Sequence, residues 1–378
     1  MYSDARYVLT TNAGSSSIKF ALFRVGAANE RALRGEIDRI GRGGSTLQVT
    51  REDERSSDRC DVDAADHASA ARLLVDWLSV QPEYQRVVAV GHRVVHGMTH
   101  TDPELVSPAL LEELRDIAPC DPEHLPGALA LIDAFLDRAP ALPQVACFDT
   151  AFHATQPELA TRLPLPRVYR DKGYRRYGFH GLNYEHIVSA LPAQTRGTLP
   201  RRILAAHLGS GSSMCAIQDG KSVGTTMGFS TADGLVMGTR TGSIDPGVLV
   251  ALMRDEKLTL DQLEDLLYRK SGLLGLSGIS GDMRELLASE RPEAAEAVEY
   301  YCYSAARHAA SLVPALGGVD AIVFTGGVGE NAGPVRSRIM AHLAWLAVAP
   351  SDVHVIPANE ELTMARHVAS VLALAPEA

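Results

Sequence analysis

The chain has 378 residues, of which 46% are hydrophobic and 22% charged, and its formal net charge at pH 7 is −10. This length predicts two domains, and the acidic balance argues against nucleic acid or an anionic membrane as the main partner. No apolar run approaches the roughly 20 residues that cross a bilayer, and the first residues lack the apolar core of a signal peptide. The five cysteines have no paired metal-ligand spacing, so we expect a reduced, cytoplasmic protein without a zinc site.

The first predicted element is a β-hairpin with an unusual turn. Residues 7–10 and 18–23 have the apolar pattern of buried strands, and residues 12–17 between them read Asn-Ala-Gly-Ser-Ser-Ser. Ordinary hairpins are closed by two residues such as Asn-Gly. This longer turn offers hydroxyl groups and uncovered backbone N–H groups, and Lys19 adds a positive charge, so it suits an anion or a metal-bound phosphate. A Ser-rich turn without any ligand has the same pattern.

The rest of the first half alternates strand and helix patterns. We expect strands at 86–90 and 144–148, one or two strands within 32–59, an exposed charged turn at 51–55, and helices at 67–78, 110–117 and 127–136. Arg93 follows one of these strands and suits a phosphoryl group or a carboxylate, with a surface salt bridge as the alternative. Asp149 ends another strand and suits a metal ligand, a base or a simple turn cap.

A second hairpin at 203–217 repeats features of the first. When Gly209 is aligned with Gly14, His207 falls on Asn12, and apolar strands flank both turns. The repetition fits two similar α/β domains. Further patterns predict helices from about 184 and at 260–268, 283–288, 292–312, 335–346 and 359–372, and strands at 321–324 and 353–356.

Glycine-containing turns follow three of the predicted strands, at Gly14, at 209–211 and at 326–329. The third leads into a helix, whose first N–H groups favour phosphate. None has the Walker or the dinucleotide-binding spacing, so each alone is compatible with a plain turn. Their occurrence together favours nucleotide binding.

Two other side chains lie among small residues. Arg240 stands between Gly238 and Gly242, and no acidic residue is adjacent to it in the sequence. An arginine on such a loop suits the clamping of an anion, with a surface salt bridge as the alternative. His180 lies in a loop expected at 175–183, where a structural role is equally compatible with the pattern.

Further motifs occur along the chain in a fixed order, at 12–19, 92–97, 148–153, 177–181, 207–209, 224–229, 237–246, 326–331 and 359–361. Together they resemble the acetate kinase family of ATP-dependent carboxylate phosphotransferases, in the superfamily of acetate and sugar kinases, Hsp70 and actin. The resemblance implies an α/β fold of two duplicated actin-like (ribonuclease H-like) domains with a central cleft. Residues 1–149 would form the first, with a helix at 360–378 packing back on it. Residues 150–359 would bind nucleotide and form a homodimer.

The resemblance also implies roles for individual residues. Arg93 and Arg240 would grip the carboxylate and the transferring phosphoryl group, His180 would donate to phosphoryl oxygens, and Asp149 would position the carboxylate and metal. Asn12 and Glu360 would help to hold Mg²⁺, for which Mn²⁺ is an alternative. Arg93, Val95, Cys120 and Phe179 would contact the carboxylate substrate. ATP would lie against Ser15, Ser17, Lys19, His207, Leu208, Gly209, Ser210, Gly211, Asp282, Met283, Arg284, Gly327, Val328, Gly329, Glu330 and Asn331.

Four positions depart from the family pattern. Thr231 replaces a proline of the apolar acyl pocket, and Ser210 replaces an asparagine beside the nucleotide. Cys120 and Asp121 take the places of a leucine and a histidine in a stretch that is one residue shorter here. An acidic group facing the acyl chain would repel a carboxylate, so either it turns away or the substrate is not plain acetate.

We therefore expect reversible, Mg²⁺-dependent phosphorylation of a short-chain carboxylate, with acetate as the first candidate. Such a carboxylate is ionised at pH 7, so the protein has to cancel charge and align the groups rather than supply a base. Propionate, butyrate or another small acid is the alternative substrate. A nucleotide-dependent binding or sensing protein without turnover is the alternative from another class.

Overall fold

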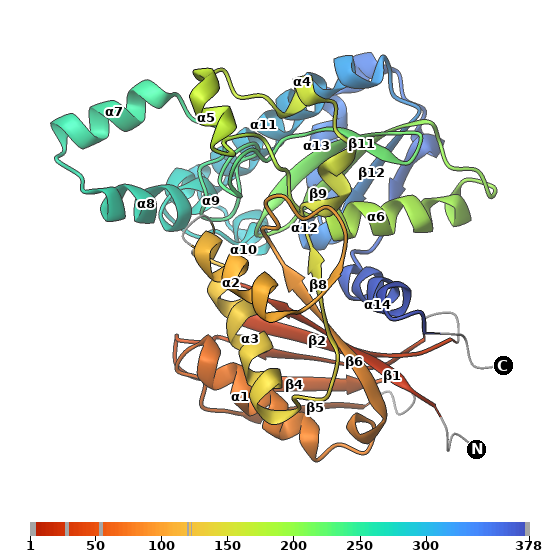
Figure 1. The fold of residues 1–378 in the computed structure, drawn as a ribbon. Coiled ribbons are helices and arrows are strands. Elements are labelled where there is room, and N and C mark those ends of the chain that lie inside the picture. Colours follow the sequence, from red (N-terminus) through yellow and green to blue (C-terminus); the bar gives the residue numbers. More distant parts are fainter. Residues whose placement is uncertain (1–4, 27–29, 53–55, 119–120, 122, 375–378) are drawn as a thin grey trace. The chain divides into compact units, whose positions relative to one another are not determined.

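The computed structural model describes residues 5–26, 30–52, 56–118, 121 and 123–374. It divides into two compact units (Figure 1), of which the first comprises Met1–Ala151 with Asn359–Ala378 and the second Phe152–Ala358. No helix in the described ranges is long and apolar enough to cross a membrane.

The first unit is built on a sheet of eight strands. They are β1 (Tyr7–Ala13), β2 (Ser17–Arg24), β3 (Arg31–Asp38), β4 (Thr46–Arg51), β5 (Ser56–Asp61), β6 (Val87–Val94), β7 (Glu104–Leu105) and β8 (Gln144–Phe148). Their order is β5-β4-β3-β2-β1-β6-β8-β7. The strands β1 to β5 form an antiparallel meander, while β6 is parallel to both β1 and β8.

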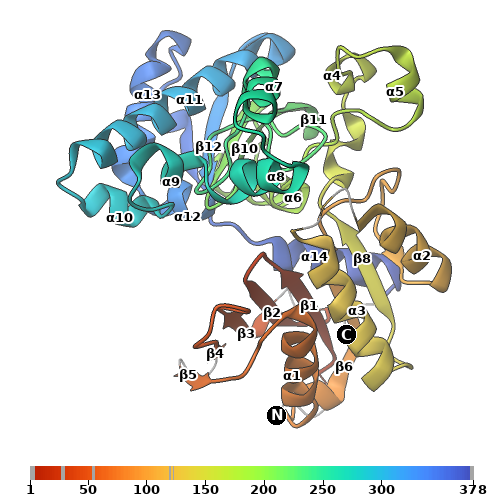
Figure 2. The ribbon, with the colours of Figure 1, turned by 90° about the vertical axis from the view of Figure 1, so that its left-hand side faces the viewer.

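Helices cover both faces of this sheet. The helices α1 (His67–Ser79) and α3 (Leu125–Arg138) lie side by side on one face (Figure 2), where Leu9, Val90 and Phe135 share one core. The helix α14 (Glu360–Val371) packs on the other face. Its approach to β6 is close: a Cβ added to Gly91 would lie 2.8 Å from the side chain of Val368. Neighbouring residues on a strand point to opposite faces of the sheet, so a short apolar strand contributes side chains to the cores on both faces. The helix α2 (Pro108–Ile117) packs near strand β8, where Leu110 and Leu114 share a core with Phe148.

The second unit contains a sheet of five strands, β9 (Arg202–Leu208), β10 (Ser212–Gln218), β11 (Lys221–Thr225), β12 (Ala321–Thr325) and β13 (Val353–Val355). The long helix α11 (Pro292–Leu316) packs on one face with Leu204 and Ala206, and α6 (Gly181–Ala190) packs on the other with Ile203 and Ala205. The remaining helices are α4 (Glu158–Thr161), α5 (Arg167–Asp171), α7 (Pro246–Asp255), α8 (Leu260–Arg269), α9 (Gly272–Ser277), α10 (Met283–Ala288), α12 (Gly326–Asn331) and α13 (Gly333–His342).

The two sheets share a five-strand pattern. The order β3-β2-β1-β6-β8 in the first unit corresponds to β11-β10-β9-β12-β13 in the second, with the same strand directions throughout. The two hairpins β1–β2 and β9–β10 thus hold equivalent places. The second turn is one residue shorter, because Ala13 pairs with Ile18 whereas Leu208 pairs with Ser212. Ser213 therefore takes the place of Lys19 in the register.

Several element boundaries differ from the sequence prediction at functional positions. Arg93 lies inside β6 rather than after a strand, because β6 continues to Val94 between two parallel neighbours. The helix α6 begins at Gly181 rather than near 184, which places Asn183 in its first turn. The glycine turn predicted at 326–329 is helical and forms α12. Three strands occupy 31–61, and α7 and α9 were not predicted.

A buried histidine beside Arg93 ties three strands together. His92 is 1% exposed, its Nε2 donates to Gln144 Oε1 at 2.7 Å, and Thr11 Oγ1 donates to its Nδ1 at 2.8 Å. Burial lowers the pKa of His92 to about 4, although the bond to Gln144 opposes this shift.

We expect this histidine to make the protein sensitive to acid. The unfolded chain takes up a proton near pH 6.5 and the folded state only near pH 4, so folding stability falls as the pH drops through this window. The full effect is on the order of 3 kcal/mol. Urea unfolding at a series of pH values measures it, and a His92→Gln variant should lack this part of the pH dependence. An unchanged slope in that variant would contradict the assignment.

Candidate functional site

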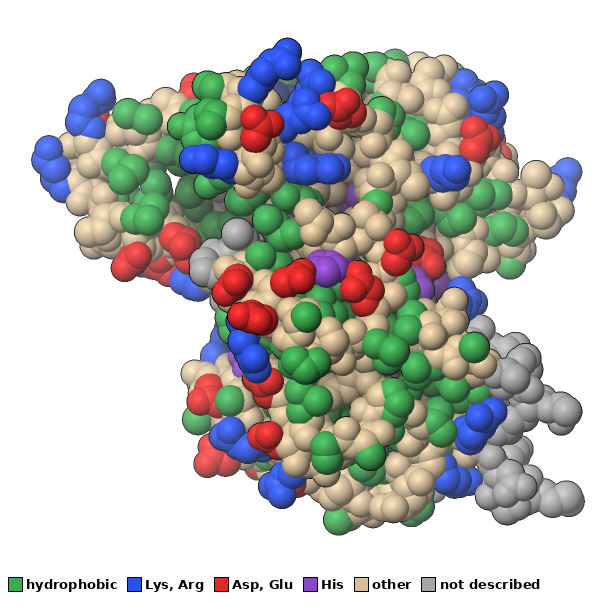
Figure 3. All heavy atoms as spheres, in the orientation of Figure 1, with side chains coloured by type: hydrophobic (Ala, Val, Ile, Leu, Met, Phe, Trp, Pro, Cys, Tyr) green, Lys and Arg blue, Asp and Glu red, His purple; other side chains and the backbone are tan. Residues whose placement is uncertain are grey.

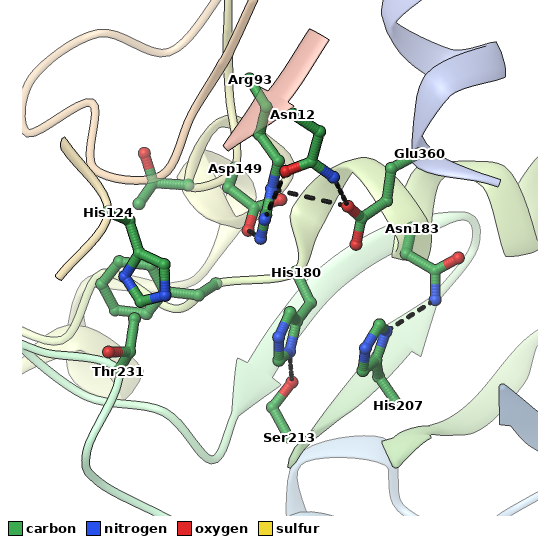
Figure 4. A network of polar contacts seen from close by, with 12 residues as sticks. Asn12, Arg93, His124, Asp149, His180, Asn183, His207, Ser213, Thr231 and Glu360 are labelled. Carbon is green, nitrogen blue, oxygen red and sulfur yellow. Dashed lines mark hydrogen bonds and ion pairs between the residues drawn. The ribbon is translucent and has the colours of Figure 1, made fainter. Parts of the chain in front are cut away.

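In the first unit, the side chains of Asn12, Asp149 and Glu360 meet around Arg93 (Figure 4). Its Nη1 donates to Asn12 Oδ1 at 3.1 Å and its Nη2 to Asp149 Oδ2 at 2.6 Å. Its Nε lies 3.5 Å from Glu360 Oε2, which also accepts from Asn12 Nδ2 at 3.0 Å. These groups come from the ends of β1, β6 and β8 and from the first turn of α14. Parallel strands end at the same sheet edge, which is why residues so distant in sequence converge.

The electrostatics of this network follow from its burial. Asp149 is fully buried, and the side chains of Arg93 and Glu360 are each 12% exposed. Burial by itself lowers the pKa of Arg93, but the carboxylates of Asp149 and Glu360 outweigh it and raise the pKa. Next along α14, burial and the charge of Glu360 raise the pKa of Glu361. Arg93 thus remains charged and is held rigidly.

The predicted phosphate turn in the first unit is shorter than expected. Asn12 belongs to β1, and Gly14 N donates to Ser17 O at 2.8 Å across the turn. Ser15 is exposed, Ser17 is half-buried, and Lys19 projects from the exposed side of β2. His67, at the start of α1, lies with its Nε2 2.8 Å from Gly14 O, so the main chain of the turn is anchored from a helix.

The predicted acyl-contacting residues of the first unit are only partly described. Val95 is buried, and Cys120 lies outside the described residues. Asp121 is 5% exposed and its Oδ1 lies 2.9 Å from His124 Nδ1, while its charge also acts on Arg93. Its carboxylate therefore has both a hydrogen-bonding and an electrostatic partner within the first unit. Glu123 is half-buried.

A divalent cation fits the oxygen atoms of the Arg93 network. Asn12 Oδ1 and the carboxylate of Glu360 are hard donors of the kind that Mg²⁺ prefers, and Mg²⁺ commonly keeps one or two protein ligands with water and phosphate completing its shell. Among the described residues, no group of three or more His, Cys, Asp or Glu side chains is arranged to hold a metal. The donor set thus suits a cation that arrives with a nucleotide rather than a closed structural site.

In the second unit, His180 stands in an unusual backbone conformation. It is the residue before α6, with φ of 61° in the left-handed region that few non-glycine residues adopt. The carbonyl of Phe179 accepts from His153 Nε2 at 3.0 Å, which holds the main chain, and His180 Nδ1 lies 2.8 Å from Ser213 Oγ. Such strain persists only where surrounding contacts determine it.

A second histidine stacks on His180. The rings of His180 and His207 are 4.0 Å apart and nearly parallel, with an interplanar angle of 8°. Asn183 Nδ2 donates to His207 Nδ1 at 2.9 Å and to Thr325 Oγ1 at 3.2 Å. The stacking holds the two imidazole rings face to face.

Arg240 and His180 approach the same point of the second unit. Arg240 Nη1 donates to Thr231 O at 3.0 Å. A Cβ placed on Gly211 would lie 3.4 Å from His180 Nε2 and 3.8 Å from Arg240 Nη1. A charged donor and an imidazole nitrogen therefore share the space in front of the β9–β10 turn.

The glycine turns of the second unit also lie together. A Cβ on Gly209 would come within 4.0 Å of Gly327 N, so the turn after β9 adjoins α12. Gly326 has φ of 78° and a Cβ there would meet Leu208 O at 2.7 Å, which only glycine avoids. Gly238 lies between the β9–β10 turn and the segment that precedes α10. Its N donates to Ser210 O at 3.0 Å, and a Cβ on Gly281 would lie 2.8 Å from Gly238 O.

The other predicted nucleotide residues differ in what they can offer. The side chains of Leu208 and Met283 are buried in the core, so only their backbones are available. Asp282 caps α10 by accepting from Arg284 N at 2.8 Å, and the Arg284 side chain is exposed. Within α12, Gly329 is buried, Val328 is half-buried, Glu330 Oε1 accepts from Ala358 N, and Asn331 Nδ2 donates to Gly327 O.

We expect a methyl group on Gly211 to impair the site without unfolding the protein. In a Gly211→Ala variant the new Cβ makes only ordinary contacts, but it occupies the space in front of His180 Nε2 and Arg240 Nη1. Transfer to a bound acceptor should fall by about tenfold to a hundredfold at unchanged melting temperature. Gly333→Ala, whose Cβ would meet only Arg336 at 3.8 Å, is the matched control. Equal rates for both variants would contradict this arrangement.

Several supporting residues escaped the sequence prediction. They are His67, which contacts the Gly14 turn, and His153, Asn183, Tyr184 and Ser213, which surround the two stacked histidines. Their signal in the sequence is weak, since each makes its contact across a wide sequence separation. The available indications were the position of Ser213 beside the second glycine turn and that of His153 at the end of the motif at 148–153.

Comparison with known proteins agrees with this geometry. The model of the Acetokinase family matches residues 7–366. An acetate kinase of Rhodopseudomonas palustris (strain ATCC BAA-98 / CGA009) is 43% identical over 96% of this chain and 97% of its own, and one of Rickettsia akari is 38% identical over 97% and 99%. Among solved structures, Porphyromonas gingivalis acetate kinase matches with a TM-score of 0.85 at 31% identity, covering 97% of this chain and 100% of its own. A propionate kinase from Francisella tularensis matches with a TM-score of 0.88 at 31% identity, covering 96% and 98%. The chain therefore belongs to the acetokinase family.

Proposed function

We propose that the protein reversibly transfers the γ-phosphoryl group of ATP to a short-chain carboxylate, with acetate as the first candidate. The observation that carries this proposal is the convergence of His180 Nε2 and Arg240 Nη1 in front of Gly211, beside adjoining glycine turns. Membership of the acetokinase family and the acetate kinases among its relatives support it.

The chemistry needs no general base. A carboxylate oxygen forms a bond to the γ-phosphorus as the bond to the bridging oxygen of ADP breaks, and the products are an acyl phosphate and ADP. Both reactants are anions, so charge cancellation and in-line alignment are the main tasks of the protein. We assign Arg240 and His180 to the oxygens of the phosphoryl group in transfer, and Arg93 to the carboxylate.

The supporting groups follow from their contacts. Asp149 accepts from Arg93 at 2.6 Å and would keep its guanidinium in place. The Ser15, Ser17 and Lys19 turn would approach the ATP phosphates, and the segments at 207–211, 282–284 and 327–331 would hold the nucleotide. Asn12 and Glu360 would hold Mg²⁺, or Mn²⁺ in its place. When bound, such an ion neutralises phosphate charge.

A second substrate deserves equal testing, since a propionate kinase is among the similar structures. Thr231 is buried and its carbonyl oxygen accepts a hydrogen bond from Arg240, so its backbone has a role independent of its side chain. The side chain carries a hydroxyl group and is therefore more polar than the proline that the family resemblance predicts. Propionate, butyrate or a hydroxylated acid therefore belongs in any panel of acceptors.

Hydroxamate trapping tests the proposal directly. The protein, Mg²⁺ and ATP are incubated with formate, acetate, propionate, butyrate or lactate, and hydroxylamine converts any acyl phosphate into a coloured hydroxamate. We expect the highest rate with acetate and none without divalent cation. If ATP binds but no acid yields product, the protein is a non-catalytic nucleotide-binding protein and the proposal is overturned.

We also propose that the protein acts as a homodimer in the cytoplasm, formed through the second unit. Apolar side chains gather over α7 and α8 (Figure 3), where Val250 is 61% and Leu260 70% exposed, and Tyr300 and Tyr303 on α11 are also exposed. Apolar patches of this kind commonly mark interfaces. Sedimentation velocity should show twice the chain mass, and a Val250→Asp, Leu260→Asp variant should sediment as a monomer.

A further inference from the structure

A chain of buried hydroxyl groups leads to His180 from inside the second unit. Tyr184, on α6, is fully buried, and its hydroxyl lies 2.6 Å from Ser213 Oγ. Ser213, on β10, is also fully buried, and its Oγ lies 2.8 Å from His180 Nδ1. His180 is the residue before α6, and Tyr184 lies in the first turns of that helix. All three atoms lie within one compact unit.

The direction of these hydrogen bonds decides what His180 can do. A phenol is more acidic than a serine hydroxyl, so it is the better donor, and the short distance fits Tyr184 donating to Ser213 Oγ. Ser213 then uses its own proton to donate to His180 Nδ1. A neutral imidazole whose Nδ1 accepts must carry its proton on Nε2.

Nε2 is the atom that lies beside Arg240 in front of Gly211. Phosphoryl oxygens only accept hydrogen bonds, so a neutral histidine there helps only in the Nε2–H form. We propose that Tyr184, acting through Ser213, is a positioning residue that holds His180 as the Nε2–H tautomer, poised to donate to the transferring phosphoryl group. This inference rests on the proposed function for the identity of the acceptor alone.

The surroundings hold Tyr184 in place for this role. Its ring packs edge-on against the ring of His153, with centroids 5.7 Å apart, and lies 6.4 Å from the ring of Phe152. His153 in turn donates to Phe179 O, which belongs to the residue before His180. Phenylalanine at position 184 would keep the ring contacts and lose only the hydroxyl, which makes Tyr184→Phe a selective change.

The kinetic test is a double-mutant cycle. We expect Tyr184→Phe to lower kcat about threefold to tenfold at unchanged KM for ATP, because one hydrogen bond of the chain is lost. Ser213→Ala should lower kcat at least as much. The combined variant should show no further loss, because Tyr184 acts on His180 only through Ser213. Independent, multiplicative losses would overturn the relay.

The spectroscopic test does not depend on turnover. In protein with ¹⁵N-labelled histidine, long-range ¹H–¹⁵N correlation distinguishes a ring nitrogen that carries a proton from one that accepts. The His180 signals are identified by their loss in His180→Asn, since asparagine tolerates the left-handed backbone. We expect the Nε2–H form in the unmodified protein and a mixture of tautomers in Ser213→Ala.

A matched control separates the relay from general destabilisation. Tyr301 is 1% exposed and its hydroxyl lies 3.0 Å from Ser212 Oγ, so Tyr301→Phe removes a bond of the same kind in the same unit. It should leave the His180 signals unchanged. If no acid is phosphorylated, the proposed function fails and the tautomer still decides this inference. If His180 has the same tautomer with and without Ser213, this inference fails whatever the activity.

Discussion

Replacing Arg240 by alanine is expected to lower kcat by about a hundredfold to a thousandfold while ATP affinity stays almost unchanged. Loss of one preorganised donor to charge that develops in a transition state typically has an effect of this size. Arg240 is oriented by its bond to Thr231 O and shares the space before Gly211 with His180. The hydroxamate assay measures kcat, and calorimetric titration with Mg²⁺ and ATP measures affinity.

The control for this experiment is Arg201→Ala in the same unit. Its guanidinium lies 3.4 Å from Asp219 on the surface, and both side chains are more than half exposed, so neither rate nor affinity should change. Arg240→Lys is also informative, because lysine keeps the charge but lacks the planar fork. Near wild-type turnover in Arg240→Ala would refute the assigned role.

Replacing Arg93 by alanine should reduce both activity and folding stability. The variant would leave the carboxylates of Asp149 and Glu360 close together without the cation that links them. Removal of one partner from a buried ion pair destabilises a protein by roughly 3–5 kcal/mol. We expect a loss of this order at neutral pH by urea unfolding.

Two further variants separate the structural from the substrate-binding role of Arg93. The double variant Arg93→Ala, Asp149→Asn should regain part of the stability, because one buried charge is removed with its partner, but it should not regain activity. Arg115→Ala removes an exposed pair with Asp133 and should change stability by less than about 1 kcal/mol. If the double variant is active, Arg93 does not bind the carboxylate.

The surroundings of Arg240 were predicted from the sequence more completely than those of Arg93. The surroundings of Arg240, small residues and no adjacent acid, were sufficient to mark it as an anion-binding candidate. The strand that contains Arg93 was predicted too short, and its acidic partners were not foreseen. Strand ends are difficult to predict because pairing with neighbouring strands extends them, and those neighbours are remote in sequence.

The sequence by itself determined the repeated hairpin, the order of the glycine turns, and the arginine and histidine residues on which the proposed chemistry rests. These features are local, since turn geometry, strand periodicity and short motifs depend on neighbouring residues. Family membership follows from the same motifs and agrees with the comparisons. Where the sequence departs from the family pattern, at Cys120 and Asp121, neighbouring residues did not determine whether the acidic side chain faces the acyl group.

Only the tertiary structure decided how the reactive groups are held. Asn12 and Glu360 are 348 residues apart yet share a hydrogen bond, and Asp121 lies 2.9 Å from His124, a partner that the sequence analysis did not assign to it. We propose that the tautomer of His180 depends on Ser213, which lies 33 residues further along the chain on β10. Hydrogen-bond direction, burial and ionisation are set by the atoms that surround a group in space, and the chain order alone does not specify those atoms.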